Sequence, residues 1–386
     1  MTSSARRYRV LLVVSSMDAG GLETYIVNVL STLDLARFDV TIACTRSMSD
    51  WYSGELTSLG VTTLHCPNPY TQLSYVRRVA ALMRRRRIEA VCDFRSGFAG
   101  PTMFAAWLVG VRSRIAAVRS TGVGYERTFL RNAYVGALNA LTRRFATRIL
   151  GNAEPVLDSF HASWRDEPKI YGVVPNGVDT ATYRRKDGRD LRHALGLPED
   201  AIVVGHVGRI HGSKDHRTII SAFAKLRESV RNARLLLVGD GVSKGEVERH
   251  VAELGLAKAV LFTGARKDVP ALLSGMDIFF FPSRYEGLPN ALLEAMSCEL
   301  PIVASNIPEI AHVVPQELSS WLHDPGDTEA FANSLAALSA APSTRKRLGR
   351  LGRDRVLDRF SIGTSAKRLS EEWTAPLGDA SGATLP

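Results

Sequence analysis

Long hydrophobic runs are missing from this sequence of 386 residues. No stretch approaches the ~18 consecutive apolar residues that a membrane-spanning helix needs. The apolar run near the N-terminus, Val10 to Val14, is too short for the hydrophobic region of a signal peptide and ends in two serines. We therefore expect a cytoplasmic protein.

Cysteine is scarce as well. The four cysteines form no CxxC pair and no Cys/His spacing of a zinc site. Their neighbours are apolar or typical of strands, so the sequence predicts buried free thiols, which fits a reducing compartment. No G-x-G-x-x-G fingerprint occurs, and this argues against a nicotinamide enzyme.

The remaining composition is globular, with 45% hydrophobic and 23% charged residues. The net charge of +10 is uneven. Residues 1–180 hold 22 Lys and Arg against 14 Asp and Glu, a net of +8, and residues 181–386 hold 27 against 25, a net of +2. The first half is therefore suited to an anionic partner: nucleic acid, a membrane face or an anionic acceptor.

One basic segment has helical periodicity. Apolar residues recur on one side of it at Leu73, Val76, Ala80 and Met83, and the other side carries Arg77, Arg78, Arg84 and Arg85. The segment 127–148 repeats the theme with Arg131, Arg143 and Arg144. The pattern fits either a solvated helix or a helix that docks on an anionic membrane surface. No nucleic-acid-binding motif accompanies the charge, so nucleic acid is not an expected partner.

Short apolar runs alternate with helical patterns along the whole chain. This alternation predicts an α/β protein with parallel sheets, and about a dozen strands fit two Rossmann-like domains better than one sheet. We expect domains at 1–180 and 181–357, with a C-terminal helix at about 358–375 that packs back on the first domain.

Doubly wound sheets bind ligands at the carboxyl ends of their strands. After the apolar run 202–207 comes a glycine-rich loop with two cations, Gly208, Arg209 and Lys214, which suits a diphosphate or is simply a solvated basic loop. Gly239-Asp240-Gly241 after the next run favours a structural turn, and Gly264 follows the run 260–263.

A pair of glutamates follows the run 278–281. Glu286 precedes a predicted helix at 291–298, Asn290 is a candidate N-cap, and Glu294 lies one turn inside the helix. Two carboxylates at this spacing can bracket one ligand by accepting hydrogen bonds from sugar hydroxyls. Early in the chain, Gly20 and Gly21 open a helix after the first strand and can cradle phosphate.

These segments together resemble the GT-B glycosyltransferases of family 4 (glycosyl transferases group 1), of the bacterial surface-polysaccharide type. The resemblance covers nearly the whole chain and rests on an ordered set of motifs: Gly20-Gly21, Pro175-Asn176-Gly177-Val178-Asp179, Gly208-Arg209 with Lys214, Val238 to Gly241, and Glu286 to Glu294 with the E-x7-E spacing. It implies two Rossmann-like domains that face each other across a cleft.

The resemblance also implies roles for individual residues. Arg209, Lys214 and Glu286 would form the catalytic set, in which the two cations hold the donor diphosphate and Glu286 binds the donor sugar. Glu294 would bind the ribose. The other donor-binding residues would be Gly20, Gly21, Gly208, Gly264, Arg266, Gly287, Leu288 and Pro289.

The family pattern retains the anomeric configuration and needs no cofactor or metal, and no D-x-D pair stands where a metal would be needed. Many relatives carry a histidine after the strand that corresponds to residues 114–118. This sequence has Arg119 and Ser120 there, and Arg95 ends a neighbouring strand. These three residues are weaker candidates for contacts with the acceptor or with the donor sugar.

The sequence thus predicts a retaining transferase of the hexosyltransferase type (EC 2.4). It would move a sugar from a UDP- or GDP-sugar to a glycan or lipid-linked acceptor in lipopolysaccharide, capsule or exopolysaccharide synthesis. The expected place is the cytoplasm, either free or peripheral at the inner face of the cell membrane. A nucleotide-sugar epimerase and a non-catalytic nucleotide-sugar-binding protein are the alternatives. The sequence does not specify the donor sugar, the acceptor or the oligomeric state.

Overall fold

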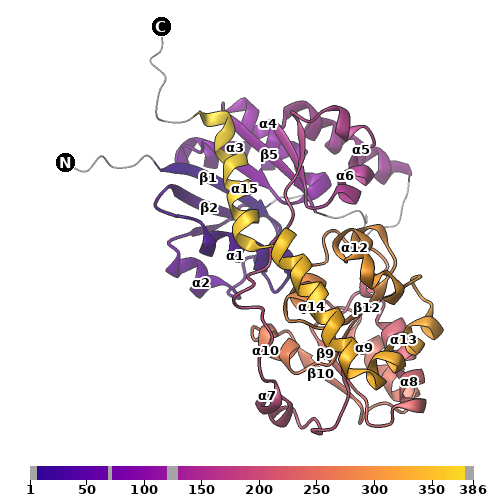
Figure 1. The fold of residues 1–386 in the computed structure, drawn as a ribbon. Coiled ribbons are helices and arrows are strands. Elements are labelled where there is room, and N and C mark those ends of the chain that lie inside the picture. Colours follow the sequence, from indigo (N-terminus) through magenta and orange to yellow (C-terminus); the bar gives the residue numbers. More distant parts are fainter. Residues whose placement is uncertain (1–6, 68–71, 120–128, 379–386) are drawn as a thin grey trace. The chain divides into compact units, whose positions relative to one another are not determined.

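A computed structural model describes residues 7–67, 72–119 and 129–378 of the chain. The chain forms two compact units (Figure 1). The first comprises residues 1–177 together with 362–386, and the second comprises residues 178–361. The division therefore falls three residues before the limit at residue 180 that the sequence analysis uses, and the last helix belongs to the first unit.

The first unit contains a parallel sheet in the order β3-β2-β1-β4-β5-β6-β7. Its strands are β1 (Tyr8–Val14), β2 (Phe38–Cys44), β3 (Thr62–His65), β4 (Ala90–Asp93), β5 (Ser113–Val118), β6 (Arg148–Gly151) and β7 (Tyr171–Val173). Its longer helices are α1 (Gly21–Thr32), α2 (Ser53–Ser58), α3 (Gln72–Arg86), α4 (Gly100–Leu108), α5 (Phe129–Phe145), α6 (Glu154–Phe160) and α15 (Ile362–Thr374).

Helix α15 packs on the first unit through one apolar stripe. Ile362, Ala366, Leu369 and Trp373 recur at a spacing of three or four residues and are all buried. The Trp373 ring meets the ring of Phe38 edge to face, with 5.6 Å between centroids. The predicted return of the C-terminal helix is thus visible as part of this core (Figure 1).

The second unit contains a parallel sheet in the order β10-β9-β8-β11-β12-β13. Its strands are β8 (Val203–Val207), β9 (Arg234–Val238), β10 (Val260–Gly264), β11 (Ile278–Phe281), β12 (Ile302–Ser305) and β13 (Leu322–His323). Its helices are α7 (Arg189–Ala194), α8 (His216–Ser229), α9 (Lys244–Glu253), α10 (Val269–Ser274), α11 (Asn290–Ser297), α12 (Pro308–Val313), α13 (Thr328–Ala340) and α14 (Pro342–Arg359).

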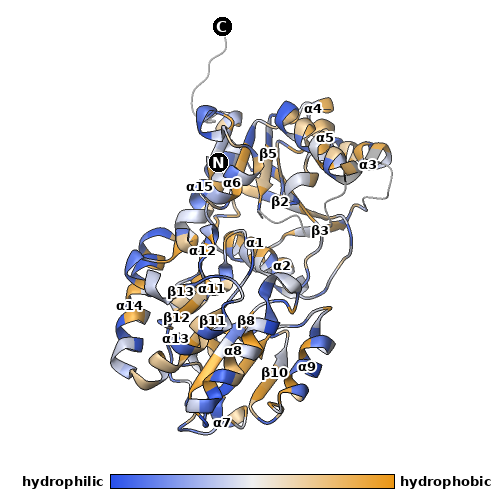
Figure 2. Cartoon of the chain, turned by 90° about the vertical axis from the view of Figure 1, so that its right-hand side faces the viewer, coloured by the Kyte–Doolittle hydropathy of each residue, from blue (hydrophilic) through white to orange (hydrophobic). Residues whose placement is uncertain are grey.

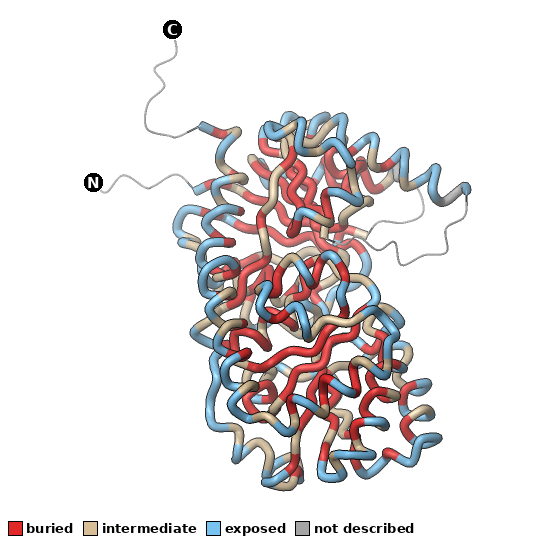
Figure 3. Tube along the Cα trace, turned by 45° about the vertical axis from the view of Figure 1, so that its right-hand side comes forward, coloured by how far each residue is buried: buried red, intermediate tan, exposed pale blue. Residues whose placement is uncertain are grey.

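Burial on both faces of the sheet explains why the strands are continuous apolar runs in the sequence. Helices cover both faces of a parallel sheet, so neither face of a central strand meets water. In β11 every residue from Ile278 to Phe281 is fully buried. The strands are accordingly drawn mostly red in Figure 3 and largely orange in Figure 2, whereas helices such as α14 carry hydrophilic stretches. The apolar runs therefore predicted the strand positions closely.

The order of strands reverses once in each sheet. In the first unit β1 pairs with both β2 and β4, and in the second unit β8 pairs with both β9 and β11. The loops after β1 and β4, and those after β8 and β11, thus diverge at the carboxyl edge and leave room for a ligand.

Two further expectations concern the whole chain. The four cysteines are free and buried, as predicted, and burial raises the pKa of the Cys44 thiol to about 11. Within the described ranges, none of the helices combines the length and hydropathy that a bilayer crossing requires.

Candidate functional site

Three successive strand-end loops of the second unit are joined by backbone hydrogen bonds. The Gly208 N–H donates to the carbonyl of Val238 at 2.9 Å, and the Ile210 N–H donates to the carbonyl of Asp240 at 2.9 Å. The Gly239 N–H in turn donates to the carbonyl of Gly264 at 2.9 Å. The glycines that the sequence analysis selected after β8, β9 and β10 therefore form one edge of a single site.

Two of these glycines allow the loops to approach so closely. A Cβ atom on Gly239 would lie 2.0 Å from the Gly208 carbonyl oxygen, and one on Gly241 would lie 2.2 Å from the Ile210 carbonyl oxygen. Gly239 also has φ of +139°, which other residues rarely adopt. The structural role that the sequence favoured for Gly239 and Gly241 is confirmed.

Lys214 and Glu286 meet at the centre of this edge. Lys214 ends a short 3₁₀ turn after β8, and its Nζ forms an ion pair with Glu286 from the loop after β11. The two side chains are only 18% and 9% exposed. Lys214 Nζ also lies 4.8 Å from the centroid of the Phe281 ring. The structure thus brings together the residues predicted to bind phosphate and sugar, and it pairs their opposite charges.

A second pair fixes the same two loops. Arg284 donates its backbone N–H to the Ser213 carbonyl at 2.8 Å, and its guanidinium lies 2.9 Å from the buried carboxylate of Asp215. Asp215 also caps α8 by accepting from the N–H and hydroxyl of Thr218. Its φ of +49° is unusual for a residue with a side chain. The Lys214 backbone is therefore held on both sides.

Helix α11 begins one residue earlier than predicted. Its first residue is Asn290, and Pro289 is the N-cap because the Pro289 carbonyl accepts from the N–H groups of Leu292 and Leu293. The prediction of Asn290 as N-cap was wrong for this reason. Leu288 and Pro289 are buried and Gly287 is partly exposed, so this segment leads directly from Glu286 into the helix N-terminus.

Glu294 lies one turn inside α11, as predicted. Burial raises the pKa of its carboxyl to about 8, although a hydrogen bond from the Tyr183 side chain acts in the opposite direction. Tyr183 is a site residue that the sequence analysis missed. The Ser297 hydroxyl donates to its backbone carbonyl at 2.6 Å and fixes it beside the helix.

Two buried histidines lie beneath the loops and were also missed. The His206 ring stacks near Phe281, with 5.5 Å between centroids, and contacts His216 edge to face at 5.1 Å. Burial lowers the pKa of His206 far below its usual value and lowers that of His216 to about 4. Both rings are therefore neutral at physiological pH and add no positive charge beside Lys214.

The other predicted residues of the second unit lie at the rim. Arg209 is exposed beside Gly208. Arg266 forms an ion pair with Asp268 at 2.6 Å, so its guanidinium is engaged locally. Gly264 has φ of +70° and no atom within 4 Å of an added Cβ, which means that its Cα faces open space.

In the first unit, Gly20 and Gly21 lie at the carboxyl end of β1. Gly20 is the N-cap of α1, and its carbonyl accepts from the N–H and the hydroxyl of Thr24 at 3.0 and 2.9 Å. Gly21 is the first residue of the helix. The predicted opening of a helix by this pair is confirmed.

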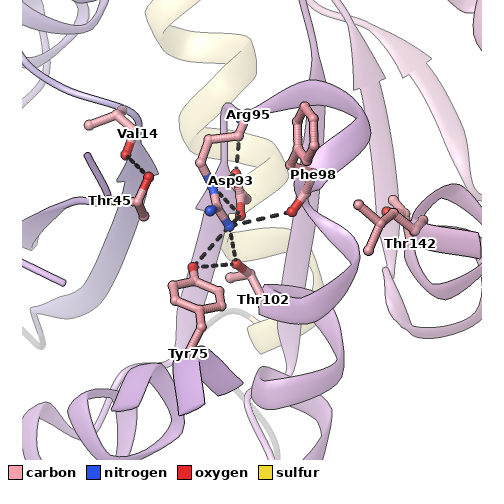
Figure 4. A network of polar contacts seen from close by, with 9 residues as sticks. Val14, Thr45, Tyr75, Asp93, Arg95, Phe98, Thr102 and Thr142 are labelled. Carbon is pink, nitrogen blue, oxygen red and sulfur yellow. Dashed lines mark hydrogen bonds and ion pairs between the residues drawn. The ribbon is translucent and has the colours of Figure 1, made fainter. Parts of the chain in front are cut away.

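Arg95 follows β4 next to β5, where the sequence analysis placed it. Its guanidinium turns inward and forms a bidentate pair with Asp93, with Nη2 2.7 Å from Oδ2 (Figure 4). Nη2 also donates to the hydroxyls of Tyr75 and Thr102 at 2.9 and 2.8 Å. This buried network joins β4 to α3 and α4, so Arg95 has a structural role.

Arg119 follows β5 and remains partly exposed. Its guanidinium lies over the rings of Tyr25 and Phe94, and Nη1 donates to the side-chain oxygen of Asn176. Asn176 belongs to the mid-chain motif noted above and is buried. Ser120, the third weak candidate, lies outside the described residues.

Two family models match this chain. Residues 20–177 match the glycosyl transferase 4-like domain, and residues 187–355 match the glycosyl transferases group 1. EpsF of Bacillus subtilis is 28% identical over 314 residues, which are 79% of this chain and 80% of EpsF. The UDP-Gal:alpha-D-GlcNAc-diphosphoundecaprenol alpha-1,3-galactosyltransferase of Escherichia coli is 25% identical, over 88% of this chain and 90% of the enzyme.

Solved structures agree on the fold. The Anabaena protein HepE, crystallised in complex with UDP, superposes with a TM-score of 0.79 at 21% identity over 95% of this chain and 100% of HepE. The two Rossmann-like units and this likeness show the GT-B fold. Within that class, the chain belongs to the glycosyl transferases group 1, family 4.

Proposed function

We propose that this glycosyltransferase moves a sugar from a nucleotide-diphosphate sugar to a lipid-linked or surface-polysaccharide acceptor, with retention of anomeric configuration. The observation that carries the proposal is the Lys214–Glu286 pair, which lies at the carboxyl edge of the second sheet just before the N-terminus of α11.

The charges of the site suit a departing diphosphate. Lys214 is held on a loop that cannot easily move, Arg209 is exposed beside it, and the positive end of α11 follows. When the glycosidic bond breaks, negative charge develops on the leaving phosphate oxygen. Positioned cations stabilise this charge strongly because they need no reorganisation during the reaction. We propose that this set acts without a bound metal ion.

The ion pair also gives a route for donor recognition. An incoming phosphate competes with Glu286 for Lys214, because charge-assisted hydrogen bonds to phosphate are among the strong ones. Glu286 is then released toward the sugar hydroxyls, which can donate to its carboxylate. Glu294 lies one turn further along α11, where the Tyr183 side chain hydrogen-bonds to it, and this pair is suited to the ribose. A uridine donor is supported by the UDP complex of HepE and by the UDP-Gal substrate in the name of the Escherichia coli relative.

The acceptor side is proposed to face an anionic membrane. The apolar residues Val76, Ala80 and Met83 of α3 are buried, so this helix cannot insert them into lipid, and Leu73 is exposed rather than part of that stripe. Instead, α4 and α5 expose other apolar side chains: Trp107 at 50%, Leu108 at 48%, Phe129 at 85%, Tyr134 at 44% and Leu141 at 36%. Leu141 lies seven residues after Tyr134 and three before Arg144, so the three share one side of α5. Arg144 lies over the Phe145 ring, which packs against Trp107 of α4.

This α4–α5 face combines the two features of an interfacial surface. Aromatic and aliphatic side chains enter the headgroup region, while arginines attract anionic lipid. A lipid-linked acceptor, as in the name of the Escherichia coli relative, would be met at such a surface. Flotation of the whole protein with vesicles tests this: Trp107→Ala and Arg144→Gln should each reduce recovery on anionic vesicles. Equal recovery of the wild type on neutral and anionic vesicles would contradict the proposal.

The transfer itself is tested with a donor panel. Wild-type protein should release UDP from one of UDP-glucose, UDP-galactose or UDP-N-acetylglucosamine, with NMR showing retention in the product and with no loss of rate in EDTA. Lys214→Ala and Glu286→Ala should each lower kcat by about 100-fold or more. Lys225→Ala is the matched control because Lys225 forms an exposed pair with Glu329 in the same unit. Wild-type rates in both site variants would refute the assignment, and interconversion of donor sugars would indicate an epimerase.

A further inference from the structure

Arg119 is held in an unusual way for a charged residue. Its guanidinium carbon lies 5.0 Å from the ring centroid of Tyr25 and 4.8 Å from that of Phe94. Tyr25 belongs to α1 and Phe94 directly follows β4, so two neighbouring elements each provide an aromatic face. Such faces attract a cation and keep its plane in a fixed orientation.

The hydrogen bonds around Arg119 leave part of its guanidinium unused. The backbone N–H donates to the Ser96 hydroxyl at 3.0 Å, and Nη1 donates to Asn176. Nε is buried and has no hydrogen-bond partner in the described part of the chain. Ser96 itself has φ of +54°, a strained conformation for a serine, and the loop therefore sets the Arg119 backbone at some energetic cost.

The surroundings of the Tyr25 hydroxyl hold the aromatic face in place. The Ser365 hydroxyl donates to the Pro175 carbonyl at 2.5 Å, and the Tyr25 hydroxyl lies 2.9 Å from the Ser365 hydroxyl oxygen. Because the single Ser365 proton is used, Tyr25 is the donor in the second bond. The site around Arg119 is thus built from α1, α15 and the mid-chain motif together.

Comparison with Arg95 shows what Arg119 lacks. Arg95 ends the adjacent strand and is neutralised by a bidentate pair with Asp93. Arg119 forms no ion pair with any residue in the ranges that the structure describes, and aromatic rings and one amide oxygen take that place. Since no carboxylate in the described ranges neutralises this partly buried cation, a ligand that supplies an anionic group would stabilise it.

We propose that Arg119 binds an anionic group, a carboxylate or phosphate, of one of the two substrates. This inference rests on the proposed transfer function. Arg119 lies at the carboxyl edge of the first sheet, next to the β1–β4 reversal where such sheets bind ligands. The donor diphosphate is already assigned to the cations of the second unit. The anion bound by Arg119 is therefore either a carboxylate on the donor sugar or a phosphate on the acceptor.

Binding measurements with matched probes separate these two sources. In the donor arm, calorimetry compares UDP-glucuronate with UDP-glucose on the full chain. In the acceptor arm, it compares a phenylalkyl diphosphate-linked α-N-acetylglucosamine with the phosphate-free phenylalkyl glycoside, in the presence of UDP. Wild-type protein should prefer the charged probe in one arm by about 10- to 100-fold, which is the range for hydrogen bonds to a charged group.

Variants show whether Arg119 is the cause. Arg119→Gln should abolish the preference for the charged probe, and Arg119→Lys should keep part of it because the charge remains but the planar fork is lost. Arg37→Gln is the matched control: Arg37 is exposed, lies 5.8 Å from the Phe38 ring centroid and precedes β2 at the opposite edge of the sheet. Arg37→Gln should leave the preference for the charged probe unchanged. If Arg119 had a packing role alone, no variant would alter the ratio of the affinities for the charged and neutral probes.

Two results would overturn the inference. One is equal affinity for charged and neutral probes in both arms, with UDP binding intact. The other is a preference that persists in Arg119→Gln. UDP binding is a separate readout: its absence in the wild type would overturn the proposed function, and the inference with it.

Discussion

Replacement of Glu294 by glutamine is expected to change how stability depends on pH. The carboxyl titrates at 4.5 in a solvated chain and at about 8 in the folded protein, because burial disfavours the charged form. Between these values the folded state binds the proton and the unfolded state does not. The free energy of unfolding of the wild type therefore falls as pH rises from about 4.5 to about 8.

The size of the effect follows from the two pKa values. At about 1.4 kcal/mol per pH unit, a rise from 4.5 to about 8 gives a ceiling of about 5 kcal/mol. Glu294 is partly exposed, so solvent screening lowers this ceiling, and we expect about 2 kcal/mol. For a unit of this size that corresponds to a melting temperature about 4–8 °C higher in Glu294→Gln than in wild type at pH 8.5.

Thermal and urea denaturation between pH 5 and 9 measures this difference. Glu294→Gln should gain stability relative to wild type as pH increases, while Glu248→Gln on the exposed face of α9 should show a constant offset. The affinity for UDP gives a second measurement. Because ribose hydroxyls donate best to the ionised carboxylate, the affinity of the wild type for UDP should rise toward pH 9. The affinity of Glu294→Gln should not rise. A difference between Glu294→Gln and wild type that does not vary with pH would refute the reasoning.

Three other changes have defined outcomes. Gly239→Ala should lower the free energy of unfolding by about 2 kcal/mol or more in urea titrations, because the added Cβ would overlap a backbone carbonyl. The control Gly245→Ala, whose Cβ would meet open space on α9, should raise the free energy of unfolding by about 0.5–1 kcal/mol. His216→Phe should reduce the loss of stability between pH 6.5 and 4, because the lowered pKa of His216 makes the wild-type unfolded state bind the extra proton; equal losses in both proteins would argue against this. Asp93→Asn should cost about 3–5 kcal/mol in denaturant midpoints, since it leaves Arg95 buried without its partner, and a stable variant would contradict the structural role of that pair.

Much of the fold was predictable because parallel strands leave a strong trace in the sequence. A strand buried on both faces is a continuous apolar run, and the loops that follow such runs contain the ligand-binding residues. Lys214 and Glu286 follow this rule. They are separated by 71 residues in the chain, but they form an ion pair because β8 and β11 are neighbours in the sheet.

Other features depend on tertiary contacts that a sequence does not display. Tyr183 reaches Glu294 from a linking segment with no periodic pattern, so nothing local marks it. Arg95 follows a strand just as Arg119 does, and only the fold shows that one turns inward to Asp93. The start of α11 was misplaced because Pro289 supplies the capping carbonyl, and a side-chain rule for Asn290 does not detect a backbone cap.

Helix α15 also has a consequence for biosynthesis. The core of the first unit includes Trp373, yet the chain makes residues 178–361 before it reaches that helix. At about 5–20 residues per second, synthesis of this stretch takes about 10–40 s, during which the N-terminal sheet exists without one of its covering helices. The second unit, which is continuous in sequence, can complete its core first. The nascent chain therefore exposes the apolar patch around Phe38 until α15 has been made, and a chaperone could bind this patch in the meantime.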